Sequence, residues 1–186
     1  MDKEQTRLYR LKDALRCNPT VGPSLILHWA KQGYLIHGAE RHGTLERLAF
    51  SFSELVYLSL IARLSWLGAI SKETTVSYPA APSTKQGTKS TEREFTKLDS
   101  PGPVFTVLEN SAWNKTLILS MLPYRVEGST PRSKKEGIRY LIHIRDQEEV
   151  QREFDLWRSG FDSTAAMAFI DASRVKRWIE DTIAKK

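Results

Sequence analysis

Three helix-like segments within the first 70 residues constrain the fold more than any other feature of the sequence. Apolar side chains recur at helical spacing over residues 8–16, 24–32 and 53–67, which is typical of helices that bury one face. Gly33 and Gly68 follow the second and third segments, where glycine adopts the left-handed backbone of a helix C-terminus at little cost. The pattern predicts a small, mostly helical N-terminal domain.

Two serines and a glycine-containing stretch mark the connections between these helices. Ser24 is expected at the N-cap or in the first turn of the second helix, and Ser53 at the N-cap of the third, because a serine oxygen accepts a hydrogen bond from a free helical N–H. Asn18-Pro19 interrupts the helical pattern between the first two helices. Residues 34–50 hold two glycines between short apolar patches, which indicates a compact loop or a β-hairpin.

The rest of the chain divides at a change of composition. Residues 71–100 are dominated by Ser, Thr, Lys, Pro and Gly, and such a segment buries too little apolar surface to offset the entropy of ordering. We therefore expect a flexible linker between an N-terminal domain, residues 1–70, and a second domain, residues 101–186. The second domain is expected to be a small α+β unit with a mostly antiparallel sheet.

The expected elements of the second domain follow from its short apolar runs. The runs predict strands over residues 103–109, 115–122, 138–144 and 165–171. Helices are expected over residues 147–158, after Asp146 as N-cap, and from Ser173 to the end of the sequence. The acidic and basic residues of the first of these helices are explained by ion pairing along a solvated helix.

Charge and motif content limit the classes of function. The formal net charge is +6, which suits nucleic acid or an anionic membrane surface as a partner. Cys17 is the only cysteine, so an intrachain disulfide and a cysteine-rich zinc site are excluded. The sequence has no glycine-rich phosphate loop and no recognised hydrolase or metalloprotease motif. We therefore expect no enzymatic activity, no cofactor and no bound metal.

Targeting signals are absent from the sequence as well. The segment MDKEQTRLYRLKD at the N-terminus lacks the apolar core of a secretory signal. No apolar run approaches the ~18 residues of a membrane span. We therefore expect a cytoplasmic protein that has no membrane partner.

Three stretches of the N-terminal region carry a resemblance to a known family: LYRLKDAL (8–15), SLILHWAKQGYL (24–35) and LAFSFSELVYLSLIARLSWLG (48–68). Their order and spacing resemble the N-terminal domain of the MerR family of transcription regulators. The resemblance implies a winged helix-turn-helix over residues 8–68, whose second helix enters the DNA major groove. The DNA-binding residues that it implies are Ser24, Leu27, His28 and Lys31 on the second helix and Arg41, His42 and Arg47 in the wing.

The sequence departs from the family pattern at two positions of the second helix. Leu27 stands where the family usually has an arginine aimed at DNA, and Ala30 stands where it usually has a glutamate. Residues 1–70 contain nine Lys and Arg against six Asp and Glu, so their net charge is only +3. The family's long dimerisation helix is missing too, because a polar segment soon follows Gly68.

These observations favour a sequence-specific DNA-binding protein, a transcription regulator that binds double-stranded DNA as a dimer or higher oligomer. The C-terminal domain is expected to form the homo-oligomer. The alternative is a winged-helix module for protein–protein interaction, such as an antitoxin, adaptor or assembly factor, without direct DNA readout. Leu27 and the small local charge favour this alternative.

Two further groups of residues have both a structural and a functional interpretation. The basic loop 125–139 is expected to be a solvated loop, with phosphate or nucleic-acid binding as the alternative. Trp113, Trp157 and Trp178 are expected in the core, with an effector pocket as the alternative. No motif supports a small-molecule effector, and Trp29 is expected in the core of the N-terminal domain.

Overall fold

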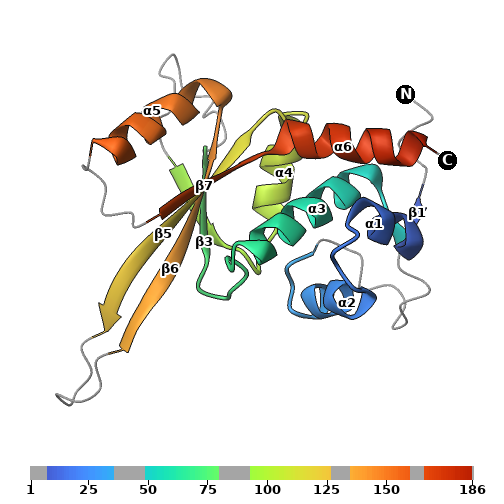
Figure 1. Ribbon diagram of the computed structural model, residues 1–186, viewed down its shortest axis with the longest axis horizontal. Helices are drawn as coiled ribbons and strands as arrows, with labels where there is room; N and C mark the ends of the chain where they lie inside the picture. The colour runs from blue at the N-terminus through green and yellow to red at the C-terminus, as the bar shows by residue number, and fades with distance from the viewer. Residues whose placement is uncertain (1–7, 36–48, 80–92, 127–134, 160–165, 186) are drawn as a thin grey trace.

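The computed structural model describes residues 8–35, 49–79, 93–126, 135–159 and 166–185. Figure 1 shows most helices gathered at one end of the molecule, and a sheet with a long hairpin and α5 (Gln147–Arg158) at the other. Both kinds of element contribute substantially, so the expected α+β class is confirmed.

Three helices and a two-stranded ladder make up the N-terminal region. α1 (Leu11–Cys17), α2 (Pro23–Lys31) and α3 (Phe52–Trp66) occupy the three predicted segments. β1 (Tyr9–Arg10) precedes α1 and pairs antiparallel with β2 (Ala49–Phe50), which precedes α3. The ladder therefore joins the start of the first helix to the start of the third.

The ends of these helices follow from local chemistry. Ser51, rather than the expected Ser53, is the N-cap of α3. The Ser51 hydroxyl accepts a hydrogen bond from the Glu54 amide at 3.2 Å, and the Glu54 carboxylate accepts one from the Ser51 amide at 2.5 Å. This reciprocal capping box fixes the first turn. Gly33 and Gly68 have φ values of +81° and +73°, which confirms their left-handed backbone.

A five-stranded mixed sheet forms the other part of the molecule. Its strands are β3 (Thr75–Pro79), β4 (Arg93–Lys97), β5 (Thr116–Val126), β6 (Lys135–Arg145) and β7 (Ala166–Asp171). They lie in the order β4-β3-β6-β5-β7. Every neighbouring pair is antiparallel except β3 with β6, so the sheet is mostly antiparallel, as expected.

The hairpin of β5 and β6 extends beyond the rest of the sheet. β7 pairs with residues 116–121 of β5, and β3 pairs with residues 141–143 of β6. The ladder between β5 and β6 continues further, to the pair Val126 and Lys135. Among the described residues, the far half of the hairpin is therefore a two-stranded ribbon, which projects from the body in Figure 1.

The prediction of a flexible linker over residues 71–100 is wrong for part of that range. β3 and β4 both lie within it, and they pair with each other over five residues at one edge of the sheet. Residues 80–92 lie outside the described part. The polar composition of the range did not prevent strand formation, because β3 gains a second neighbour, β6, from the distant part of the chain.

The prediction of a strand over residues 103–109 is also wrong. This segment forms α4 (Gly102–Asn110), whose first turn contains Pro103. Val104 and Leu108 are four residues apart, and both are buried, as neighbours on one face of a helix are. The alternation of apolar residues in PVFTVLE fits both a strand and a helix, and here the helical packing prevails.

The hydrophobic core lies between one face of the sheet, which we call the inner face, and three helices. Its buried sheet residues include Val76, Leu117, Leu119, Ile142 and Ile144, which point to the same side by strand alternation and register. They belong to one core cluster with residues of α3, α4 and α6 (Ala172–Ala184). Trp29 and Trp113 are in this cluster too, as predicted.

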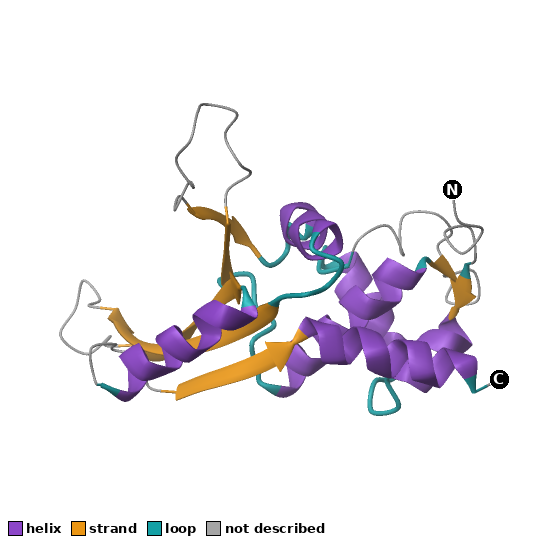
Figure 2. Ribbon diagram, turned by 90° about the horizontal axis from the view of Figure 1, so that it is seen from above, coloured by secondary structure: helices purple, strands orange, loops and turns teal. Residues whose placement is uncertain are grey.

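The last helix, α6, joins the two parts of the molecule. It begins after β7, with Asp171 as its N-cap, and packs along α1 and α3, as Figures 1 and 2 show. The Trp178 indole donates a hydrogen bond to the Cys17 carbonyl at 3.0 Å, and Arg16 donates to the Thr182 carbonyl. The N-terminal helices therefore share their core with a helix from the other end of the sequence.

The opposite, outer face of the sheet is covered differently. α5 (Gln147–Arg158) lies against β5 and β6 on this side and contains no buried residue. The Phe154 ring contacts the Phe169 ring at a centroid distance of 6.2 Å. Asp146 is the N-cap of α5, as predicted. The outer face is therefore only partly shielded by its helix.

Candidate functional site

The outer side of α2 carries the residues that sequence reasoning assigned to DNA. Ile26 and Trp29 are buried, so the helix presents its other side to solvent. Ser24, His28 and Lys31 are exposed, and Leu27 is partly buried. Ser24, His28 and Lys31 are spaced by four and three residues, so they form one stripe along the helix. We call this stripe the α2 surface.

The turn before α2 fixes the direction of that helix. Gly22 is the N-cap and Pro23 occupies the first turn, where a missing N–H costs nothing. The buried Asn18 side chain donates a hydrogen bond to the Ala14 carbonyl at 3.0 Å, and the Val21 amide donates to the Asn18 carbonyl at 2.9 Å. The turn between α1 and α2 therefore has its own hydrogen bonds and does not depend on the exposed side of α2.

The end of α2 is held as firmly as its start. Gly33 has a left-handed backbone, and a Cβ added there would lie 3.1 Å from the Asp99 carbonyl oxygen. The Tyr34 amide donates to the Trp29 carbonyl at 2.9 Å, and the Tyr34 side chain is buried. Any larger residue at position 33 would both strain the backbone and press on the segment that precedes α4.

Three of the predicted DNA-binding residues, Arg41, His42 and Arg47, lie outside the described residues. Their segment starts after α2 and ends before β2. The structure therefore describes four of the seven residues of the predicted interface: Ser24, Leu27, His28 and Lys31. Of these four, only Lys31 carries a full positive charge at neutral pH, and α2 has no acidic residue to offset it.

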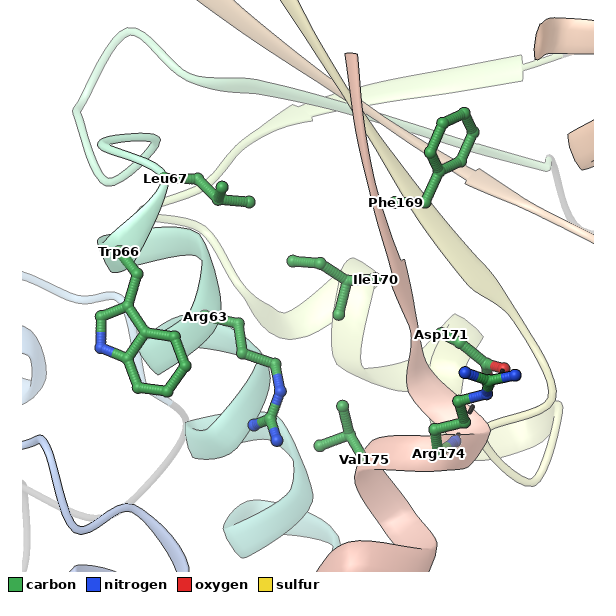
Figure 3. Close-up of a pocket in the computed structure, with 8 residues that line it drawn as sticks. All are labelled: Arg63, Trp66, Leu67, Phe169, Ile170, Asp171, Arg174 and Val175. Atoms are coloured by element: carbon green, nitrogen blue, oxygen red, sulfur yellow. Dashed lines mark hydrogen bonds and ion pairs between the residues drawn. The ribbon is translucent and has the colours of Figure 1, made fainter.

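A second candidate site is an open pocket between α3, β7 and α6, with a volume of about 400 Å³. Figure 3 shows its side chains. They are Arg63, Trp66, Leu67, Phe169, Ile170, Asp171, Arg174 and Val175. Sequence reasoning did not find this site, because its two halves are about 100 residues apart in the chain. A signal that could have found it is Arg63, which interrupts the apolar run of α3.

Arg63 is the most unusual group in this pocket. Its side chain is partly buried, and one guanidinium nitrogen donates to the Ser59 carbonyl at 2.9 Å. Within the described residues, no carboxylate forms an ion pair with it. Burial lowers the pKa of Arg63 from its ordinary value, since the surroundings do not stabilise the charge as water does.

Asp171 at the other side of the pocket is fully engaged. Its carboxylate accepts hydrogen bonds from the Ser173 amide at 2.9 Å, the Ser173 hydroxyl at 2.6 Å and the Arg174 amide at 3.2 Å. Burial alone would raise the pKa of Asp171, but these hydrogen bonds and the Arg174 charge outweigh it and lower the pKa. Asp171 thus caps α6 and also pairs with the Arg174 guanidinium at 3.5 Å.

The tryptophans considered for an effector pocket lie elsewhere. Trp113 is buried in the core, as predicted, but the core prediction is wrong for the other two. Trp178 is 48% exposed and donates a hydrogen bond to the Cys17 carbonyl. Trp157 is only partly buried and packs against Phe154 on α5, outside the core cluster. Trp66, the last residue of α3, lines the pocket instead and is 59% exposed.

A polar cluster under α5 was considered as a third site. The Ser77 hydroxyl and His143 Nδ1 are 2.8 Å apart, and Arg145 Nε donates to the Glu153 carboxylate at 2.7 Å. Ser77 is fully buried, so its oxygen is inaccessible to a substrate. The cluster connects β3, β6 and α5 and is a structural feature of the outer face.

Within the described ranges, no three His, Cys, Asp or Glu side chains gather in a way that suits a metal ion. No helix in that part of the chain combines the length and apolar character needed to cross a membrane. The sequence matches no known protein-family model and has no significant similarity to a curated protein. The assignment of a function therefore depends on the geometry of the α2 surface and the pocket.

Proposed function

We propose that this chain is a sequence-specific DNA-binding protein of the transcription-regulator class, with α2 as its recognition helix. The observation that carries the proposal is the α2 surface. Ser24, His28 and Lys31 form a polar stripe on a helix whose opposite side is anchored in the core by Ile26 and Trp29. A rigidly anchored helix with such a free side has the dimensions that the DNA major groove accepts.

The order of elements around α2 supports the same proposal. A strand, two helices joined by a short turn, a second strand and a third helix follow one another, and the two strands pair through Tyr9 and Phe50. This order is compatible with a winged helix-turn-helix. In such an arrangement the segment between α2 and β2, which contains Arg41, His42 and Arg47 and lies outside the described residues, would be the wing. Its cations would contact phosphates and supply affinity, whereas α2 would supply sequence choice.

The α2 surface also has features that favour the alternative, a protein–protein interaction module. Leu25 is exposed and Leu27 is partly exposed on α2, and apolar side chains of this kind suit a protein partner. A DNA partner uses them only for contacts with thymine methyl groups. We favour DNA because His28 and Lys31 lie along the same side of the helix and no acidic residue of α2 repels phosphate.

The test is binding of the full chain to fragments of its own genome, measured by fluorescence anisotropy as salt is raised from about 50 mM. The wild type is expected to bind a subset of fragments with strong salt dependence. His28→Ala with Lys31→Ala is expected to weaken binding roughly tenfold or more and to reduce the salt slope by about one. Arg158→Ala removes an exposed cation at the remote end of α5 and is expected to change little.

Two results would contradict the proposal. One is the absence of binding to any fragment at low salt. The other is an equal loss of affinity in the α2 variant and in the Arg158→Ala control. Equal losses would mean that DNA is attracted by the overall positive charge and not by the α2 surface. Circular dichroism of each variant checks that the fold is intact.

A further inference from the structure

We infer that the pocket between α3, β7 and α6 binds a small organic anion with an aromatic body, of the aromatic carboxylate class. The inference does not depend on DNA binding, because the α2 surface contributes no residue to this pocket. Three features carry it: an arginine without an acidic partner among the described residues, an exposed aromatic side chain beside it, and a lining carboxylate whose oxygens are already hydrogen-bonded and ion-paired.

The arginine is Arg63, which projects from α3 between Trp66 and Val175 in Figure 3. A guanidinium has five N–H donors, and the structure gives Arg63 one hydrogen bond, to the Ser59 carbonyl. Within the described part of the chain it has no ion-pair partner. A partly desolvated cation without a counter-charge is unfavourable, and a bound carboxylate would supply two acceptors in the geometry that a guanidinium prefers.

One wall of the pocket is aromatic and largely exposed. The Trp66 side chain, at the end of α3, is 59% exposed. Ile170 and Val175 supply the apolar surface on the side of β7 that faces α3 in Figure 3, whereas the Phe169 ring points to the other side of β7 and contacts Phe154. A large aromatic group exposed to water beside apolar side chains favours an apolar ligand. The volume of about 400 Å³ suits a molecule with one or two rings.

The remaining charges decide the sign of the ligand's charge. Among the described residues, Asp171 is the only acidic one that lines the pocket. Its oxygens accept the hydrogen bonds that cap α6 and pair with Arg174, which lies beside Asp171 in Figure 3. Arg63 is therefore the lining cation that has no counter-charge among the described residues, and the pocket attracts an anion rather than a cation.

The experiment uses 2-naphthoate as the probe and 2-naphthamide as its uncharged match. Calorimetry and saturation-transfer NMR measure binding to the full chain. We expect saturable 1:1 binding of 2-naphthoate and at least roughly tenfold weaker binding of 2-naphthamide, because the amide loses the charge-assisted pair with Arg63.

Variants test whether 2-naphthoate binds in this pocket. Arg63→Met keeps an apolar stem and is expected to weaken 2-naphthoate roughly tenfold while leaving 2-naphthamide unchanged. Trp66→Ala is expected to weaken both probes roughly fivefold, and since Trp66 is largely exposed its loss leaves the fold intact. Phe95→Ala is the control, because Phe95 is an equally exposed aromatic on β4 outside the pocket.

Three outcomes would overturn the inference. They are no binding of 2-naphthoate at millimolar concentration, equal affinity for the amide and the carboxylate, and equal effects of Trp66→Ala and Phe95→Ala. If Arg63→Met does not fold, the comparison of the two probes on wild type and Trp66→Ala still decides the matter.

Discussion

The two faces of the sheet are stabilised in different ways. On the inner face, aliphatic residues such as Leu119 and Ile142 are fully buried against α3, α4 and α6. On the outer face, α5 has no buried residue, and polar side chains such as Ser77 and Arg145 lie beneath it. The inner face therefore gains its stability from burial of many apolar side chains. The outer face combines one fully buried apolar residue, Ile118, and the contact of Phe154 with Phe169 with a few directed polar interactions.

The two faces therefore contribute differently to the stability of the sheet and to the choice of its strand register. Apolar contacts tolerate small shifts, but the bonds between Ser77 and His143 and between Arg145 and Glu153 form only in one register of β3, β6 and α5. β3 and β6 are the one parallel pair of the sheet, and they come from distant parts of the chain. The outer face thus helps to select this pairing, which the inner face stabilises once it has formed.

The largest effect is expected at the inner face. Leu119→Ala should lower the free energy of unfolding by about 3 kcal/mol, through lost burial and the cavity that remains. Chemical denaturation followed by circular dichroism measures it. The matched outer-face variant is Phe154→Ala, which should cost only about 1 kcal/mol although it removes a larger side chain. A larger cost for Phe154→Ala than for Leu119→Ala would refute the contrast between the faces.

An intermediate effect is expected from the ion pair of the outer face. The Arg145 side chain is 6% exposed and that of Glu153 is 25% exposed. Glu153→Ala leaves a buried guanidinium without its carboxylate and should cost about 2 kcal/mol. Arg145→Met combined with Glu153→Ala should recover most of this loss, because no charge is then buried. If the double variant is as unstable as Glu153→Ala, the charge is not the cause.

The smallest effect is expected at Asp171, where β7 leaves the sheet and α6 begins. Asp171→Ala should cost about 1 kcal/mol at pH 7 through the lost cap. The pKa of Asp171 is lowered in the folded protein, so its contribution is complete above the unfolded pKa of about 4. That contribution is lost as pH falls through the folded pKa.

The free energy of unfolding of wild type, Asp171→Ala and Asp171→Asn, measured by chemical denaturation over a range of pH, tests this dependence. The stability difference between wild type and Asp171→Ala should shrink below about pH 4. Asp171→Asn keeps an oxygen that caps the helix but does not titrate, so the difference between Asp171→Asn and Asp171→Ala should stay constant over the same range. A difference between wild type and Asp171→Ala that does not change with pH would argue against an ionised cap.

The sequence predicts those elements whose signal is local. Periodicity identified α1, α2, α3 and α5, and the left-handed glycines at positions 33 and 68 followed from their place after a helix. α4 was misassigned because its alternating apolar residues fit either structure, and packing against β3 and the core decided for a helix. β3 and β4 were missed because their stability comes from strands that are remote in the sequence.

The two candidate sites also differ in how far they can be predicted from local sequence. Ser24, His28 and Lys31 share one short helix, so their common exposure could be anticipated from spacing alone. The pocket combines the end of α3 with β7 and the start of α6. No local pattern brings Arg63 into one pocket with Val175, and only the path of the chain through the sheet does so.

The position of α6 also has a consequence for how the protein is made. The hydrogen bond from Trp178 to Cys17 joins residues 161 positions apart. At a synthesis rate of ~5–20 residues per second, α1 waits roughly 10–30 s for this partner. During that interval the surface that α6 covers on α1 and α3 is open to chaperones and proteases. We therefore expect truncated chains that lack α6 to be degraded by the cell's quality control.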